Sequence, residues 1–232
     1  MKFIKRIIFV MVSIVIIFAS VIIKQGYDVY KIAINEKSIE EKIKEIKSID
    51  NYTVYEELPR DYINAVVAVE DKRFYKHNGV DIFSILRAIF VDIKEKSFKE
   101  GGSTITQQLA KNTYFTQEKK IDRKIAEIFM AYEYEKKLSK SEIFELYVNT
   151  SYFGDGYYCV KEASLGYFDK LPKDMNLYES TLLAGIPNAP SVYAPTKNPD
   201  LAKQRQGQVI RKMREQGYLT TEQANEIISF NE

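Results

Sequence analysis

The sequence contains few of the residues that build disulfides and protein-held metal sites. Among its 232 residues there is a single cysteine, Cys159, and a single histidine, His77. One cysteine excludes an internal disulfide and a zinc site built from several cysteines, and one histidine excludes a histidine-clustered metal site. A Ser-His-Asp catalytic triad could be completed only by His77.

The chain also lacks a strong net charge. Its 34 lysine and arginine residues nearly balance 32 aspartate and glutamate residues, which leaves a formal net charge of +2 at pH 7. No strong electrostatic field therefore draws the chain to nucleic acid, and we expect no nucleic-acid partner. The length suits one good-sized domain, or a domain with a small extension.

Charge is missing altogether from one long segment near the N-terminus, Ile7–Ile23. As a helix this segment would be roughly 25 Å long, near the minimum for crossing a bilayer core. Lys2, Lys5 and Arg6 precede it, and such positive residues place the N-terminus in the cytoplasm and the chain after Lys24 outside. We therefore predict an uncleaved, single-pass anchor in the cell membrane.

Two other interpretations of this segment are less favoured. The apolar run is long for a cleaved signal peptide, and it shows no convincing small-x-small cleavage site. A buried core helix is less favoured still, because the segment has no polar face.

Residues 24–50 are rich in lysine and glutamate but carry an apolar stripe. Ile39, Ile43, Ile46 and Ile49 recur at helical spacing, which predicts a largely solvated helix that acts as a stalk. The chain that follows has a globular, mostly helical pattern without alternating strands, so we expect a mainly α fold. The predicted divisions are a cytoplasmic N-terminus at 1–6, an anchor at 7–23, a charged connector at 24–50 and a folded domain at 51–232.

Several helices of this domain are indicated by apolar periodicity and by end signals. Ser139, with Glu142 three residues later, forms a capping-box start. Further helices are expected over about four turns from Ile121, over Leu177–Ile186 with its end at Pro187, and from about Leu201 onward, while Ile82–Ile93 is a strongly apolar segment.

The segment Gly101–Asn112 combines two glycines, two threonines, adjacent glutamines and a lysine. A helix that begins at Ser103 or Thr104 has a hydroxyl cap, and such a helix start attracts anions, phosphates in particular. Lys111 lies about two turns later, on roughly the same face as Thr104. A capped surface helix with a polar face is the alternative, but the paired glutamines and the lysine favour a binding site.

Glu70 and Asp71 end a short apolar run, Asn64–Val69. A carboxylate in that position can be partly desolvated, which raises its pKa toward the range of a general base. An acidic pair exposed at a helix end is the alternative, but Phe74 and His77 follow closely and embed the acid in a local cluster. For His77 itself we favour a structural hydrogen-bonding role over catalysis.

A second charged cluster consists of Arg123, Lys124 and Glu127. The spacing of Arg123 and Glu127 is that of an intrahelical ion pair, which contributes about 0.2–0.5 kcal/mol. The same residues would also serve as a cation pair for a phosphate beside a second carboxylate, and spacing alone does not decide between the two.

Another polar group, Glu145, Tyr147 and Asn149, stands just before a glycine-containing loop. A glutamate on a helix that ends in an asparagine is common capping chemistry, so we favour a structural role for this group.

Together these groups supply two carboxylates, a helix start suited to phosphate, several cations and an outward-facing membrane anchor. That combination suits glycosyl transfer from a membrane-bound sugar pyrophosphate. One carboxylate would take the proton of the attacking hydroxyl, and the cations would stabilise the departing pyrophosphate.

The sequence resembles the peptidoglycan glycosyltransferases, which polymerise lipid II, a lipid-linked disaccharide-pentapeptide precursor. The resemblance covers roughly Tyr52–Tyr218 and rests on several ordered motifs at family-like spacing. The motifs are Glu70-Asp71-x-x-Phe74-x-x-His77-x-Gly79, Gly101–Leu109 with Lys111-Asn112, Arg123-Lys124-x-x-Glu127, the Lys140–Asn149 helix, Leu183-Ala184-Gly185, and Pro190-Ser191-x-Tyr193-x-Pro195.

The resemblance implies a lysozyme-like helical lobe with a small membrane-associated jaw subdomain, preceded by one N-terminal transmembrane helix. The apolar segment Ile82–Val91 and its basic flank are the candidates for the jaw. The implied partners are lipid II, the growing glycan strand, the membrane, and transpeptidases or other wall-synthesis proteins.

The resemblance also implies roles for individual residues. Glu70 is the expected general base that activates the 4-hydroxyl of the acceptor lipid II, while the growing glycan loses its polyprenyl pyrophosphate with inversion. Glu127 matches the family's second essential glutamate, which assists at the pyrophosphate or its metal. No obligatory cofactor is expected, and a divalent cation (Mg or Mn) at Glu127 stays open. Substrate contacts are implied for Asp71, Phe74, His77, Ser103, Thr104, Gln107, Gln108, Lys111, Asn112, Lys119, Arg123 and Lys124.

The sequence departs from the family pattern at a few positions. Lys119 stands where an arginine is frequent, and Cys159 and Asp169 each replace a frequent glycine. No Ser-x-x-Lys or Lys-Thr-Gly of a penicillin-binding transpeptidase occurs, so the chain is expected to be the monofunctional form, and a fragment of a longer enzyme is the alternative.

Two other functions compete with glycan polymerisation. One is a lysozyme-type wall hydrolase, which would explain neither the capped helix start at Ser103 and Thr104 nor the anchor. The other is a non-catalytic anchored scaffold of the wall-synthesis machinery, against which the presence of both Glu70 and Glu127 argues.

Overall fold

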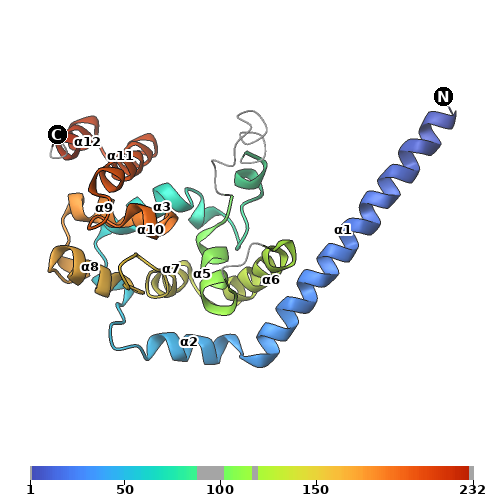
Figure 1. Cartoon of the computed structure of the whole chain (residues 1–232), viewed down its shortest axis with the longest axis horizontal. Coiled ribbons are helices and arrows are strands. Elements are labelled where there is room, and N and C mark those ends of the chain that lie inside the picture. Colours follow the sequence, from blue (N-terminus) through green and yellow to red (C-terminus); the bar gives the residue numbers. More distant parts are fainter. Residues whose placement is uncertain (1, 88–101, 117–119, 230–232) are drawn as a thin grey trace.

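The computed structural model describes residues 2–87, 102–116 and 120–229, and within these ranges it contains helices and no strand. Figure 1 shows one long N-terminal helix that projects from a body of shorter helices. The mainly α fold and the single apolar N-terminal helix are confirmed.

The projecting helix is α1, Lys2–Glu36. Among the described helices only α1 is long and apolar enough to cross a membrane, and none of its most apolar window is buried in the protein. The hydroxyls of Ser13 and Ser20 donate to the carbonyls of Phe9 and Ile16, one turn earlier. The polar atoms of these two side chains are therefore satisfied within the helix itself.

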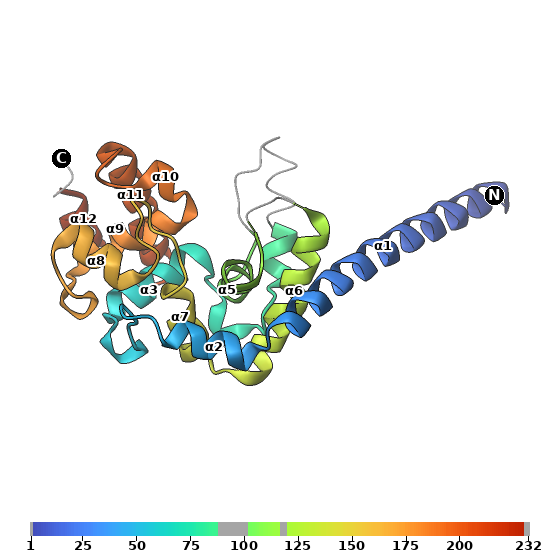
Figure 2. The ribbon, with the colours of Figure 1, turned by 60° about the horizontal axis from the view of Figure 1, so that its bottom comes forward.

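The helix continues beyond the predicted anchor and packs on the body. The second half of α1 lies against α6, Ile121–Lys137 (Figures 1 and 2). Gly26 allows this close approach, because a Cβ atom at that position would lie 2.4 Å from Cβ of Ile125. The ring centroids of Tyr27 and Tyr30 lie 5.2 and 5.7 Å from that of Phe129.

The connector predicted at 24–50 differs from a solvated stalk. Tyr30, Ile39 and Ile46 are buried and belong to the hydrophobic core of the domain. The last two lie on α2, Ile39–Lys47, which has a capping box at Ser38 and runs beneath the body in Figure 1. Ile39, Ile43 and Ile46 of the predicted stripe therefore pack on the domain, because burying them removes apolar area from water, whereas Ile49 lies beyond α2 and is exposed.

Two helix groups form the body. In one, α3 (Arg60–Glu70), α9 (Leu177–Gly185) and α11 (Pro199–Glu215) pack against one another. In the other, α5 (Ile105–Tyr114) packs against α6 and α7 (Lys140–Val148). The remaining elements are α8 (Val160–Phe168), α10 (Pro190–Tyr193) and α12 (Thr221–Ser229), with 3₁₀ turns η1 (Tyr55–Glu57), η2 (Phe74–Lys76), η3 (Pro172–Asp174) and η4 (Ile186–Asn188).

Local signals located several helix ends correctly. Ser139 and Glu142 form the predicted capping box of α7, and α9 ends just before Pro187. The helix predicted from Ile121 is α6, although its most buried face carries Ala126, Met130 and Tyr134, and Ile121 is exposed.

The two glycine replacements fit the backbone. Asp169 ends α8 in the left-handed conformation, with φ 54°, which explains why glycine is frequent there and why aspartate is accepted. Cys159 precedes α8 in an extended conformation that any residue adopts.

Residues 82–87, at the start of the predicted jaw, are helical. Ile82, Phe83 and Leu86 are exposed there and form a small apolar surface. The rest of the predicted jaw, including its basic flank, lies outside the described residues.

Gly26→Ala tests the packing of α1 on α6. Glycine to alanine normally stabilises an exposed helix by about 0.5–1 kcal/mol, but at Gly26 the new Cβ would collide with Ile125 and with the carbonyl of Asp122. We expect Gly26→Ala to lower the free energy of unfolding by about 1–3 kcal/mol, measured by denaturant titration in detergent. Gly207→Ala is the matched control and should be stabilising, since nothing lies within 4 Å of its new Cβ. Equal changes in the two variants would contradict the packing.

Candidate active site

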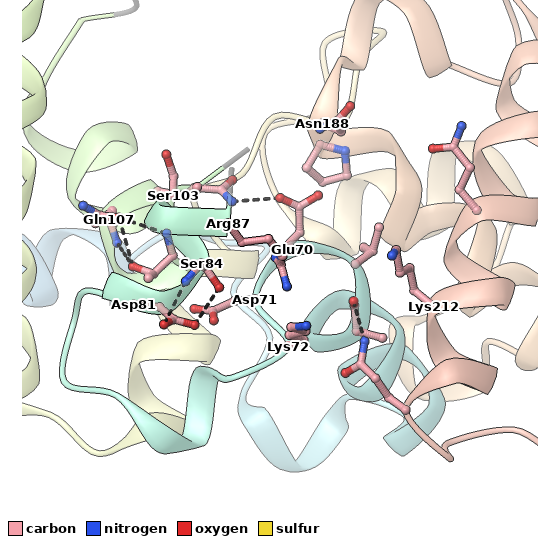
Figure 3. Close-up of a pocket in the computed structure, with 18 of the residues that line it drawn as sticks. Glu70, Asp71, Lys72, Asp81, Ser84, Arg87, Ser103, Gln107, Asn188 and Lys212 are labelled. Atoms are coloured by element: carbon pink, nitrogen blue, oxygen red, sulfur yellow. Dashed lines mark hydrogen bonds between the residues drawn. The ribbon is translucent and has the colours of Figure 1, made fainter. Parts of the chain in front are cut away.

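A cleft of about 730 Å³ lies where the two helix groups meet (Figure 3). In Figure 3 Glu70 stands between the segment that carries Ser103 and Gln107 and the helix that carries Lys212. The cleft brings together many of the residues predicted from the sequence. These are Glu70, Asp71, Ser103, Thr104, Gln107, Gln108, Lys111, Lys124 and Glu127.

Glu70 is the last residue of α3, and its side chain is 8% exposed. Its Oε2 accepts a hydrogen bond of 2.8 Å from Nε2 of Gln108, and Nη2 of Arg205 lies 3.6 Å from Oε1. Burial raises the pKa of Glu70 above its ordinary value, while Gln108, Arg205 and Lys111 partly oppose that increase. The predicted desolvated carboxylate is therefore present in the structure.

Asp71 follows Glu70 but has a different environment. Its carboxylate accepts hydrogen bonds from Nε2 of His77 at 2.9 Å and from the backbone N–H of Ile105 at 3.0 Å. The carboxylate thereby joins the end of α3 to the start of α5. His77 thus takes part in the structural hydrogen bonding expected for it, and Phe74 is fully buried in the core. Neither His77 nor Phe74 lines the cleft.

The start of α5 is capped as predicted, by Thr104. The Thr104 hydroxyl accepts from the N–H of Gln107, and the Gln107 side chain accepts from the N–H of Thr104. The carboxylate of Asp71 accepts the N–H of Ile105, so a negative group of the protein itself lies at this helix start. The N–H groups of Thr104, Ile105 and Gln107 at the start of α5 are thus hydrogen-bonded within the protein.

The second carboxylate, Glu127, lies on α6 and its side chain is 2% exposed. Nζ of Lys124 lies 2.8 Å from its Oε2, and Nη1 of Arg123 lies 3.3 Å from its Oε1. Lys124 also donates to the hydroxyl of Ser103 at 2.7 Å. The ion-pair and phosphate-site interpretations of this cluster are compatible, because Lys124 and Glu127 form an intrahelical ion pair and also line the cleft.

Lys111 completes the cationic side of the cleft. Burial lowers the pKa of its ammonium group, with Arg123 and Lys124 acting in the same direction, whereas Glu127 and Glu70 raise it. An anion that enters the cleft would replace the missing solvation and would favour the charged form of Lys111.

Besides Phe74 and His77, two further predicted residues with described positions, Asn112 and Arg123, do not line the cleft. Asn112 lines a separate small pocket beside Lys42 and Asn149. Arg123 contacts Glu127 from outside the cleft lining and donates to the carbonyl of Thr116 at 3.0 Å. Lys119 lies outside the described residues.

The sequence interpretation missed the contribution of α11. Arg205, Gln208, Arg211 and Lys212 line the cleft from this helix. The guanidinium of Arg205 lies 5.8 Å from the ring of Tyr193. The spacing of these residues places them on one face of α11. The cations on this face of an amphipathic helix were the sequence feature that could have predicted its place in the cleft.

The residues do not fit a metal ion held by the protein alone. Within the described ranges no group of three His, Cys, Asp or Glu side chains is placed to hold a metal. Both oxygens of Glu127 face cations, which compete with a metal for the same lone pairs. We therefore derive no step through a metal ion.

Glu145 and Asn149, for which a structural role is expected, join segments that are distant in the sequence. Glu145 accepts from the hydroxyl of Tyr52 and from the N–H of Tyr55. Asn149 bonds both the N–H and the carbonyl of Thr53. These contacts hold the chain before α3 against α7.

Comparison with known proteins gives a consistent family match. The family model described as Transglycosylase matches residues 35–214. Penicillin-binding protein 1F of Bacillus subtilis (strain 168) is 45% identical over 168 residues, covering 72% of this chain and 24% of the relative. Penicillin-binding protein 1A of Aquifex aeolicus (strain VF5) is 42% identical over 178 residues, covering 77% of this chain and 24% of the relative. The chain spans about a quarter of the length of these relatives.

The raised pKa of Glu70 has a consequence for stability. Because its pKa is raised in the folded state, ionised Glu70 lowers the free energy of unfolding at neutral pH, and this penalty disappears as the pH falls through the folded pKa. Glu70→Gln removes the charge at nearly constant volume, so we expect a higher unfolding midpoint than wild type at pH 7.5 and no such gain at pH 4. Denaturant titration at both pH values measures this. The exposed Glu56→Gln is the control, and a destabilised Glu70→Gln at pH 7.5 would contradict the assigned environment.

Proposed function

Because the chain belongs to the transglycosylase family, we propose that it polymerises lipid II into linear peptidoglycan glycan strands. The observation that carries this proposal is a single cleft in which the desolvated carboxylate of Glu70 faces the cations Lys111 and Lys124. A base and a cationic site for a leaving group are the two elements that glycosyl transfer from a sugar pyrophosphate requires.

In the proposed reaction Glu70 takes the proton from the 4-hydroxyl of the acceptor lipid II. The hydroxyl oxygen then bonds to the anomeric carbon of the growing glycan, while the bond from that carbon to the pyrophosphate breaks. Attack from the face opposite the leaving group inverts the configuration and forms a β-1,4 linkage. The proton remains on Glu70 until it passes to solvent, and polyprenyl pyrophosphate leaves as the anion.

The leaving pyrophosphate would be stabilised on the α5 and α6 side of the cleft. Lys111 and Lys124 supply the charge, and Ser103 holds Lys124 in place through its hydroxyl. We assign Glu127 to orienting Lys124 and Arg123 rather than to proton transfer, because both of its oxygens face these cations. A divalent cation, if one takes part, would therefore depend mainly on phosphate oxygens of the substrate.

The proposed setting is the outer face of the cell membrane. With α1 across the bilayer, Lys2, Lys5 and Arg6 favour a cytoplasmic N-terminus and an extracytoplasmic domain. The exposed apolar side chains of Ile82 and Phe83 adjoin cleft residue Ser84, so they would meet the lipid beside a lipid-linked substrate. Transpeptidases that cross-link the strands are the expected protein partners.

Neither competing function is favoured by the geometry. A lysozyme-type hydrolase needs two carboxylates that flank the scissile bond, one of them an acid. The oxygens of Glu127 pair with Lys124 and Arg123, and this pairing occupies the group that would have to act as the acid. A non-catalytic scaffold gives no account of the buried Glu70 beside Lys111.

The central experiment incubates the detergent-solubilised full chain with labelled lipid II and tests for polymer that lysozyme digests. Wild type should form polymer, and Glu70→Gln should slow it by roughly two to four orders of magnitude because the proton acceptor is lost. The exposed Glu56→Gln should react like wild type. A folded Glu70→Gln that polymerises at the wild-type rate would remove Glu70 as the base.

A binding experiment tests the pyrophosphate site separately from catalysis. Lys111→Ala should weaken the binding of a prenyl pyrophosphate about tenfold or more, the effect of losing one hydrogen bond to a charged group, and should leave a prenyl alcohol unaffected. Lys173→Ala is the control, because Lys173 is exposed and does not line the cleft. Equal affinity of Lys111→Ala and wild type for the pyrophosphate would show that Lys111 is only structural.

A further inference from the structure

The two oxygens of the Glu70 carboxylate have unequal environments. Oε2 accepts the 2.8 Å hydrogen bond from Gln108, whereas Oε1 is buried and has no hydrogen-bond partner among the described residues. Nη2 of Arg205 lies 3.6 Å from Oε1. Only Oε1 therefore keeps its lone pairs free of a short hydrogen bond.

The orientation of the Gln108 amide decides whether Oε2 of Glu70 receives a hydrogen bond. An ionised carboxylate can only accept, so the NH₂ of Gln108 must face Glu70. The carbonyl oxygen of the same amide then points the other way and lies 3.4 Å from the hydroxyl of Tyr147. In a flipped amide, the carbonyl oxygen of Gln108 would face the carboxylate of Glu70, and two acceptors would meet. The NH₂ group would then face the hydroxyl of Tyr147, which is a donor in this structure.

Tyr147 is well suited to fix this orientation. It lies on α7, its residue is 1% exposed, and its ring belongs to the hydrophobic core. Burial, with a smaller contribution from the charge of Glu70, raises the pKa of the Tyr147 phenol well above its ordinary value. The phenol thus keeps its proton at neutral pH and remains a donor to Gln108.

We propose that Gln108, oriented by Tyr147, is a positioning residue that binds Oε2 of Glu70 and fixes the orientation of the base. This inference rests on the proposed function, since it concerns the base of the same reaction. Tyr147 does not line the cleft and acts only through Gln108. Gln108 lines the cleft, so a direct substrate contact is the competing role for that residue.

The proposal has a consequence for pH dependence. The charged and titratable groups that interact with Glu70 include Asp71 beside it, Tyr62 on α3, Lys111 on α5, Arg205 on α11 and Tyr147 on α7. Lys72 and Arg87 line the same cleft. The hydrogen bond from Gln108 lowers the pKa of Glu70 against the effect of burial. When that bond is lost the pKa must rise further, so the fraction of ionised base at neutral pH falls.

The test compares Tyr147→Phe with Tyr134→Phe in the full chain. Tyr134 is also fully buried, and its hydroxyl lies 3.0 Å from that of Thr113, outside the cleft. Both variants lose one buried phenol hydrogen bond, but only Tyr147→Phe releases Gln108. We expect Tyr147→Phe to lower kcat at pH 7 about fivefold, the effect of one neutral hydrogen bond, with KM unchanged. The acid limb of its pH–rate profile should move to higher pH, while Tyr134→Phe keeps the wild-type profile.

A direct titration makes the result independent of turnover. Protein labelled with ¹³C at the glutamate carboxyl carbons is followed by NMR, and the Glu70 signal is assigned from its absence in Glu70→Gln. The Glu70 titration should move upward in Tyr147→Phe and further upward in Gln108→Leu. The double variant should match Gln108→Leu alone, because the neutral phenol of Tyr147 makes no hydrogen bond to Glu70 and reaches its carboxylate only through the amide.

The outcomes separate this inference from the proposed function. If wild type does not polymerise lipid II, the proposed function fails, and the NMR titration still decides whether Gln108 and Tyr147 control Glu70. An unchanged Glu70 titration in Tyr147→Phe overturns the inference. So does a Gln108→Leu variant that raises only KM, because that result assigns Gln108 to substrate binding.

Discussion

The buried carboxylate of Asp71 ties together the two helices on which the site is built. It ends α3, accepts the first backbone N–H of α5, and is itself held by His77. Glu70 and Gln108 are each placed by one of these two helices, so their hydrogen bond depends on the junction that Asp71 makes. A negative group at a helix start is stabilised by the helix dipole as well as by hydrogen bonds.

The cleft combines buried charges of both signs, and each is only partly compensated. Glu127 is neutralised by two cations, whereas Glu70 has one hydrogen bond and a guanidinium at 3.6 Å. This difference distinguishes the two carboxylates, because Glu127 is paired with cations, whereas burial raises the affinity of Glu70 for a proton. The burial that disfavours the charged form of Glu70 also weakens the screening of nearby cations by water, so their attraction to a phosphate is stronger.

The parts of the structure that local pattern determines could be predicted from the sequence. The capping boxes at Thr104 and Ser139, the apolar anchor and the desolvated acid at Glu70 each depend on a few neighbouring residues. Contacts between distant segments could not be predicted. Arg205 approaches Glu70 only because α11 packs on α3, and the isoleucines of α2 are buried only because α7 lies above them. Such contacts depend on the topology and leave little trace in local spacing.

Direct packing of α1 on α6 means that the anchor and the site move as one body. A flexible tether would let a domain turn freely above the bilayer, whereas a continuous helix with Gly26 seated against Ile125 transmits its own inclination. An apolar stretch shorter than the hydrocarbon core is accommodated by local thinning of the bilayer or by flanking residues that reach the interface. The position of the cleft above the lipid surface is therefore coupled to the way α1 sits in the bilayer, so membrane thickness is a physical variable of the site.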